Sequence, residues 1–252
     1  MLTQPMLDKL SELRLRGMRA GLEEQSLNPQ YAELPFEDRL GLLLDRESCL
    51  REENRLSRRL RAARLKEQAV IEDLDFSPSR GLPRSLVMEL SQSDWVRRHF
   101  NVIVVGPTGV GKSYLACALG HSACRSDCSV RYERTSRLLS TLELSRADGS
   151  YPKLLDALSR TQLLILDDWL RDPLSPSQTR DMLEILDDRY RRASTLVATQ
   201  IPVDAWHDRL SDPTLADALL DRLVHNAFRL AIKGESRRKT HLSLTHAGHP
   251  GV

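Results

Sequence analysis

Short apolar runs alternate with helical stretches from about residue 84 onward. The apolar runs, each the length of a strand, are Asn101–Val105, Val130–Glu133, Leu163–Leu166, Thr195–Thr199 and Phe228–Ile232. Helical spacing links them at Lys112–Arg125, Arg137–Arg146, Pro152–Ser159, Gln178–Arg192 and Leu215–Val224. Apolar strands that alternate with helices are typical of a parallel sheet covered on both faces. The pattern predicts an α/β domain.

The N-terminal region has a different pattern, rich in leucine and charge. A long amphipathic helix is predicted from Pro35 to Lys66, and Gly17 and Gly21 interrupt an earlier helical pattern. Phe76–Pro83 has the Ser, Pro and Gly content of a linker. We therefore predict a small all-helical domain over residues 1–75, the α/β domain over 76–245 and a tail over 246–252.

Composition says little about which class of protein this is. Hydrophobic residues make up 40% and charged residues 29%, which suits a folded chain with a buried core. The basic residues are mostly Arg, which suits phosphate contacts, although a codon bias toward Arg explains the excess equally well. The four cysteines have no zinc-site spacing and are interpreted as core residues. With no signal peptide and no long apolar stretch, we expect a cytoplasmic protein without a membrane segment.

A glycine-rich loop follows the first apolar run and precedes a helix. Its residues are Gly106, Pro107, Thr108, Gly109, Val110, Gly111, Lys112 and Ser113, followed by Tyr114. Such a loop points backbone N–H groups at phosphates, and the helix N-terminus adds positive charge there. Lys112 is expected to reach the β- and γ-phosphates of ATP, and Ser113 to ligate Mg²⁺. Four fixed positions after a buried strand make a chance match improbable.

The run Leu163–Leu166 delivers two acidic residues next to this loop. Asp167 is expected to hold Mg²⁺, and Asp168 to orient or deprotonate the attacking water. The simpler alternative is a strand end followed by acidic residues. The run Thr195–Thr199 is predicted to insert beside the phosphate-loop strand, so that Gln200 at its tip touches the γ-phosphate or its water. A polar cap is the alternative for Gln200.

Two further arginines are candidates for cations at the γ-phosphate. Arg222 would act in trans, from a neighbouring subunit, and Arg238 in cis. An ion pair of Arg222 with Asp217 or Asp221 is the simpler alternative.

These motifs together resemble the AAA+ initiator-type ATPases, and in particular the IstB-like transposition helper proteins. The resemblance covers residues from about 10 to 240 and includes Glu23–Gln25, Leu43–Glu47, Arg58–Leu65, Leu115–Gly120, Arg146–Tyr151 and Asp212–Ala218. It implies a P-loop AAA+ ATPase that oligomerises on double-stranded DNA with ATP at subunit interfaces, deforms that DNA and delivers it to a cognate transposase. By position, Gln200 matches the sensor, Arg222 the arginine finger and Arg238 the second sensor. Leu170 departs from the family, which often has Gly there, and Arg237 stands where relatives are usually apolar.

Basic residues in two regions are candidate DNA contacts. They are Arg55, Arg58 and Arg59 on the long helix, and Arg131, Arg134, Arg137, Arg146 and Lys153 around the second strand. With few aromatics, they are expected to contact the phosphate backbone and read few bases. A solvated charged face is the alternative for the long helix. A DnaC-like replicative helicase loader remains the alternative function, whereas the acidic pair and Arg222 argue against a small-molecule kinase.

Overall fold

The computed structural model describes residues 4–236, which divide between two compact units, Met1–Arg58 and Arg59–Val252. The first unit holds α1 (Gln4–Glu12), α2 (Arg16–Leu27), the 3₁₀ turn η1 (Pro29–Glu33) and most of the long helix α3 (Phe36–Ala63). Residues 59–75 lie in the unit that contains the sheet. A compact unit defined by its contacts is not the same as a domain, so the domain boundary expected after residue 75 stays a prediction.

In the first unit, α2 and α3 cross closely because two glycines of α2 face α3. A Cβ at Gly17 would lie 2.6 Å from the Cα of Glu47, and one at Gly21 would lie 2.8 Å from Cδ2 of Leu43. The buried carboxylate of Glu47 accepts hydrogen bonds from the backbone N–H groups of Gly17 at 2.7 Å and Met18 at 3.2 Å. These N–H groups begin α2 and have no partner inside the helix. The glycines that interrupt the apolar pattern therefore permit helix packing.

The second unit is built on a five-stranded sheet with the order β2-β3-β4-β1-β5. All neighbouring strands are parallel, and they are β1 (Asn101–Val105), β2 (Val130–Arg134), β3 (Leu163–Asp167), β4 (Ser194–Thr199) and β5 (Ala227–Ala231). The predicted α/β fold with a central parallel sheet is confirmed. β4 lies between β3 and β1, as expected for the inserted strand.

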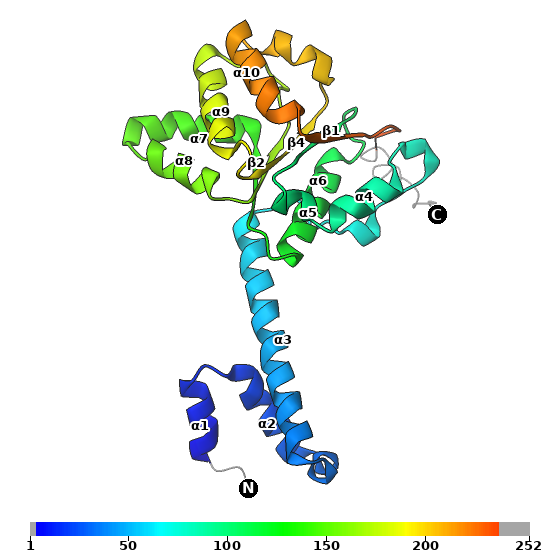
Figure 1. Cartoon of the computed structure of the whole chain (residues 1–252), viewed down its shortest axis with the longest axis vertical. Coiled ribbons are helices and arrows are strands. Elements are labelled where there is room, and N and C mark those ends of the chain that lie inside the picture. The colour runs from blue at the N-terminus through cyan, green and yellow to red at the C-terminus, as the bar shows by residue number, and fades with distance from the viewer. Residues whose placement is uncertain (1–3, 237–252) are drawn as a thin grey trace, which may run out of the picture. The chain divides into compact units, whose positions relative to one another are not determined.

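Helices cover both faces of this sheet (Figure 1). One face packs against α7 (Thr135–Asp148), α8 (Tyr151–Ser159), α9 (Pro176–Arg189) and α10 (Pro213–Val224), and its strand residues include Ile103, Leu164 and Val197. The opposite face packs against α6 (Lys112–Arg125), where a Cβ at Gly120 would lie 2.7 Å from Cδ1 of Ile165. The short helices α4 (Arg84–Ser91) and α5 (Asp94–Arg97) precede β1. Burial on both faces explains why the strands are apolar throughout.

Local signals explain where several helices begin. α9 begins with a capping box between Ser175 and Gln178, and Pro176 occupies its first turn. The carboxylate of Asp212 accepts backbone N–H groups at the start of α10. The remaining 3₁₀ turns are η2 (Ile71–Asp73), η3 (Pro78–Arg80), η4 (Val203–Ala205) and η5 (His207–Arg209). Across the described residues, every helix is too short or too polar to cross a membrane.

Candidate nucleotide-binding site

The glycine-rich loop joins the end of β1 to the start of α6. Gly109 and Gly111 have φ angles of 85° and 97°, in the left-handed region that glycine adopts without strain. α6 begins at Lys112 immediately after the loop, so the positive end of the helix dipole points at it. Within the loop, Nζ of Lys112 donates to the carbonyl oxygen of Pro107 at 2.8 Å. The loop therefore has the conformation that a phosphate site requires.

Asp167, at the end of β3, lies beside this loop. Its Oδ2 accepts hydrogen bonds from Oγ of Ser113 at 2.7 Å and from the hydroxyl of Tyr132. Its Oδ1 is buried and has no hydrogen-bond partner among the described residues. Hydroxyl and carboxylate oxygens are the ligands that Mg²⁺ prefers, so Ser113 and Asp167 fit a magnesium site. In residues 4–236, no group of three or more His, Cys, Asp and Glu side chains could hold a metal, so nucleotide and water oxygens would complete the coordination.

Asp168 is held by two arginines. Its Oδ2 accepts from Arg134 Nη2 at 2.6 Å and Nε at 3.2 Å, and it lies 3.7 Å from Nη1 of Arg171. Partial burial raises the pKa of Asp168, but the hydrogen bond and charge of Arg134, with the charges of Arg171 and Lys66, outweigh it and lower the pKa below its ordinary value. Asp168 is therefore ionised at neutral pH, as a general base must be.

The backbone after β3 is strained. Asp168 and Leu170 have φ angles of 56° and 50°, in the region where a Cβ is costly. Leu170 is fully buried in the core that includes Trp169, which stacks edge-on against Trp206. A positive φ explains why glycine suits position 170, and burial of the leucine side chain offsets its strain here.

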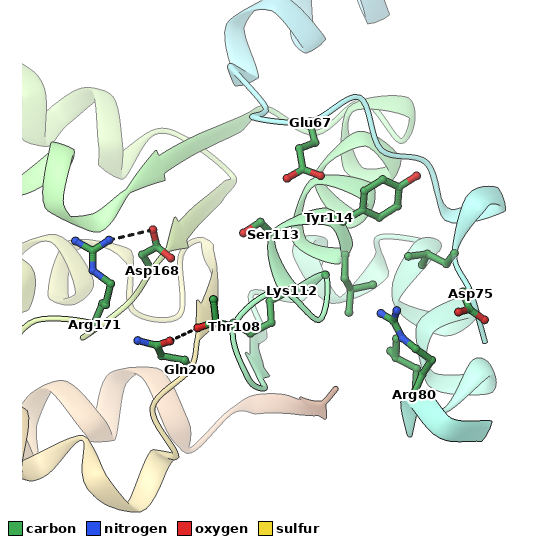
Figure 2. Close-up of a pocket in the computed structure, with 15 residues that line it drawn as sticks. Glu67, Asp75, Arg80, Thr108, Lys112, Ser113, Tyr114, Asp168, Arg171 and Gln200 are labelled. Atoms are coloured by element: carbon green, nitrogen blue, oxygen red, sulfur yellow. Dashed lines mark hydrogen bonds and ion pairs between the residues drawn. The ribbon is translucent and has the colours of Figure 1, made fainter. Parts of the chain in front are cut away.

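The phosphate loop, Ser113 and Asp168 line one cavity of about 410 Å³, a size typical of ligand pockets, and Asp167 lies behind Ser113. Figure 2 shows Lys112, Ser113 and Thr108 on one wall, with Asp168 and Gln200 across from them. Oγ1 of Thr108 donates to Oε1 of Gln200 at 2.6 Å. The tip of β4 therefore reaches the phosphate loop, and contact of Gln200 with the γ-phosphate or its water stays a prediction.

Other residues of this pocket were missed at the level of sequence. Glu67, Asp75, Arg80 and Arg171 all line it. Arg80 is buried, and its Nη2 donates to the carbonyl oxygen of Val110 at 2.6 Å. It comes from the segment interpreted as a linker, which instead packs on the phosphate loop. No sequence motif identifies these residues, because it is the path of the chain around α6 that brings them to the pocket.

Arg222 lies at the opposite edge of the sheet from the phosphate loop. Its carbonyl oxygen accepts a hydrogen bond from Nδ2 of Asn101, the first residue of β1. The phosphate loop instead follows Val105, the last residue of that strand. Its guanidinium donates to Asp187 at 2.7 Å and Asp221 at 3.1 Å and lies over the ring of Tyr190. The ion pair with Asp221 that the sequence offered as an alternative is therefore present. The role of Arg222 in trans stays a prediction.

Arg237 and Arg238 lie outside the described residues. The segment that leads to them approaches the site, because a Cβ at Gly109 would lie 2.1 Å from Oγ of Ser236. The role of Arg238 as a second sensor stays a prediction.

The candidate DNA contacts fall into two groups. Four have structural partners: Arg59 binds Asp127, Arg131 binds Glu133, Arg134 binds Asp168 and Arg146 binds Asp181. Arg55, Arg58, Arg137 and Lys153 are exposed, although Arg55 lies 3.9 Å from Glu52 and Arg58 donates to the carbonyl oxygen of Asn54 at 3.4 Å. DNA contact by any of the eight stays a prediction.

Comparisons with known proteins agree with this geometry. The family described as "IstB-like ATP binding protein" matches residues 8–245. A protein of Sinorhizobium fredii, named as an insertion sequence ATP-binding protein, is 51% identical over 95% of this chain and 98% of its own length. The corresponding protein of the insertion sequence IS21 from Pseudomonas aeruginosa is 33% identical over 91% of this chain and 86% of its own length.

Solved structures share the fold at low sequence identity. The crystal structure of DnaI has a TM-score of 0.58 at 20% identity and covers 66% of this chain and 92% of its own. DnaA from Aquifex aeolicus bound to AMPPCP has a TM-score of 0.57 at 16% identity, covering 74% of this chain and 58% of its own. The P-loop, the inserted strand and the match across nearly the whole length lead to one conclusion: the chain belongs to the family of IstB-like ATP binding proteins and has an AAA+ fold.

Proposed function

We propose that this chain is an ATP-dependent, DNA-binding regulator of DNA transposition. In this proposal it oligomerises on double-stranded DNA, deforms the DNA and delivers it to a cognate transposase. The observation that carries the proposal is a glycine-rich loop with Ser113 bonded to Asp167 and with Asp168 beside it, in a chain of a family whose relatives are named after insertion sequences.

Hydrolysis of ATP follows from the roles of the site residues. Lys112 and the loop N–H groups would hold the phosphates, and Mg²⁺ on Ser113 and Asp167 would neutralise charge there. Asp168 accepts the proton of the attacking water, and Gln200 orients that water. The water oxygen forms a bond to the γ-phosphorus while the bond from that phosphorus to the bridging oxygen of ADP breaks, which gives ADP and phosphate. Arg134 contacts Oδ2 of Asp168 and lowers the pKa of this carboxylate, which weakens it as a base, so turnover is expected to be slow.

Assembly is supported by the place of Arg222. A cation is needed at the γ-phosphate in this chemistry, yet Arg222 lies at the far edge of its own sheet. A second copy that presents its Arg222 to this site would complete it, which makes the ATP site a subunit interface.

The DNA part of the proposal is tested by fluorescence anisotropy of a labelled duplex. With a non-hydrolysable ATP analogue, binding is expected to be tight at low salt and to weaken steeply as salt rises, since phosphate contacts release counterions. Tight binding without nucleotide, or binding insensitive to salt, would contradict it. Random-sequence and insertion-site duplexes should bind alike if few bases are read.

The helicase-loader alternative is supported by the fold alone. The crystal structure of the DnaC helicase loader has a TM-score of 0.52 at 21% identity. Relatives named after insertion sequences reach 51% identity, which favours the transposition role. Co-purification with a transposase favours it further, whereas co-purification with a replicative helicase would favour the alternative.

A further inference from the structure

The ammonium group of Lys66 lies beside the carboxylate of Asp167. Nζ of Lys66 is 3.9 Å from Oδ2 of Asp167 and 3.8 Å from Oε1 of Glu67. The Asp167 side chain is 1% exposed, whereas that of Lys66 is 33% exposed. Lys66 thus reaches from the surface to a nearly buried carboxylate and lies between two negative groups.

The backbone around Lys66 is fixed on α6. Arg64, just after α3, has a φ of 52°, which turns the chain out of the helix. The next residue, Leu65, packs over the bare backbone of Gly120. The buried thiol of Cys117 lies beside the backbone of Lys66 and of Glu67. Both charged side chains therefore start from defined positions beside the site.

We propose that Lys66 is the counter-ion of Asp167 in the absence of metal and that Mg²⁺ binds by displacing it. Mg²⁺ and the ammonium would compete for the same oxygen, Oδ2 of Asp167. Two cations cannot both approach a single carboxylate closely without repulsion. Glu67 gives the released ammonium a partner at an almost equal distance, so the exchange needs only a small movement.

The exchange explains how a buried carboxylate is tolerated in a site without metal. Asp167 has a buried oxygen without a hydrogen bond, and an unpaired buried charge is costly. Lys66 supplies a positive charge to this carboxylate at its other oxygen, Oδ2, and leaves when Mg²⁺ arrives. Displacement of Lys66 would also remove one of the contacts that hold residues 59–70, although Leu65 stays packed on Gly120.

The test is a Mg²⁺ titration of a fluorescent, non-hydrolysable ATP analogue bound to the full chain. In Lys66→Met, the competing cation is gone, so the half-saturating Mg²⁺ concentration should fall by about 3- to 10-fold, the effect of one partly exposed charge. Lys66→Arg keeps the charge and should titrate near the wild type. Lys9→Met is the matched control, since Lys9 also pairs with a carboxylate, 3.0 Å away on α1.

Hydrogen exchange of residues 59–70 gives a second readout that does not depend on activity. In the wild type, exchange should quicken when Mg²⁺ is added to the analogue complex. In Lys66→Met it should already be fast without Mg²⁺.

This inference rests on the proposed magnesium site. Different results would contradict the magnesium site and the exchange at Asp167. If nucleotide binding in the wild type ignores Mg²⁺, the magnesium site itself is wrong. If the wild type responds but Lys66→Met has an unchanged or higher midpoint, the exchange at Asp167 is wrong and the magnesium site stands.

Discussion

A mixture of two inactive variants tests whether Arg222 acts in trans. Arg222→Ala lacks the cation for its neighbour, and Asp168→Asn lacks the base of its own site. Each variant alone is expected to lose activity, by ~10³–10⁵-fold for an arginine finger and ~10²–10⁴-fold for a general base. Mixed together, they can form interfaces in which one subunit supplies Asp168 and its neighbour supplies Arg222.

The geometry makes action in cis impossible without unfolding the sheet. The carbonyl of Arg222 is bonded to Asn101, and the phosphate loop begins after Val105. At ~3.3 Å per residue, the strand between them spans ~13 Å, and the γ-phosphate would lie beyond its end. An arginine side chain is shorter than that, and Arg222 is held at its own edge by Asp187 at 2.7 Å.

The expected ATPase rate of the mixture follows from random assembly of the two variants. In an equal mixture, half of the sites keep Asp168 and half of their neighbours keep Arg222, so about a quarter of the sites are complete. The ATPase rate of the mixture with duplex DNA should therefore reach about a quarter of the wild-type rate per subunit.

The assay is phosphate release at varied ratios of the two variants. Arg160→Ala is the control, because Arg160 is exposed just after α8 and pairs with Asp156 at 2.9 Å on the surface. It should keep wild-type activity. A mixture as inactive as its components would refute the trans role, and an active Arg222→Ala alone would refute any role.

Three other predictions concern single features of the structure. Gly109→Val should reduce binding of an ATP analogue by at least about 10-fold in an equilibrium binding assay, because a positive φ and the nearby Ser236 leave no room for a branched side chain; binding as in the wild type would contradict the loop conformation. Arg134→Met should move the acid limb of the ATPase pH–rate profile to higher pH, since loss of the cation raises the pKa of Asp168 and the base then stays protonated to higher pH; an unmoved limb would mean that Asp168 is not the titrating base. Gly17→Val should lower the free energy of unfolding of the N-terminal helices by about 1–3 kcal/mol in urea, because its side chain would meet the backbone of α3, with nucleotide affinity unchanged; no loss of stability would contradict the close crossing.

The arrangement of the candidate phosphate site was predictable because its residues are local in sequence. The glycine loop follows an apolar strand directly, and the acidic pair ends another. The inserted strand was predicted as well, and its tip, Gln200, contacts Thr108 at 2.6 Å. In each case a residue at the end of a buried parallel strand must emerge at the same edge of the sheet.

Residues that come from outside the strands were not predictable in this way. Arg80 lies in a stretch with the composition of a linker, yet its side chain is buried against the phosphate loop. Lys66 stood in a run of basic residues that gave no sign of a neighbouring carboxylate. Arg134 was grouped with DNA contacts, although its pairing in register with Asp167 places it beside Asp168. The position of Arg134 could have been inferred only from the pairing of β2 with β3, which requires the strand order and the register.

Light scattering after size exclusion, on the full chain with duplex DNA, tests the central claim most directly. The account predicts a large protein–DNA complex only with ATP, and a longer-lived one for Asp168→Asn, which binds ATP without hydrolysing it. A protein that stays monomeric and ignores DNA with and without ATP would contradict it.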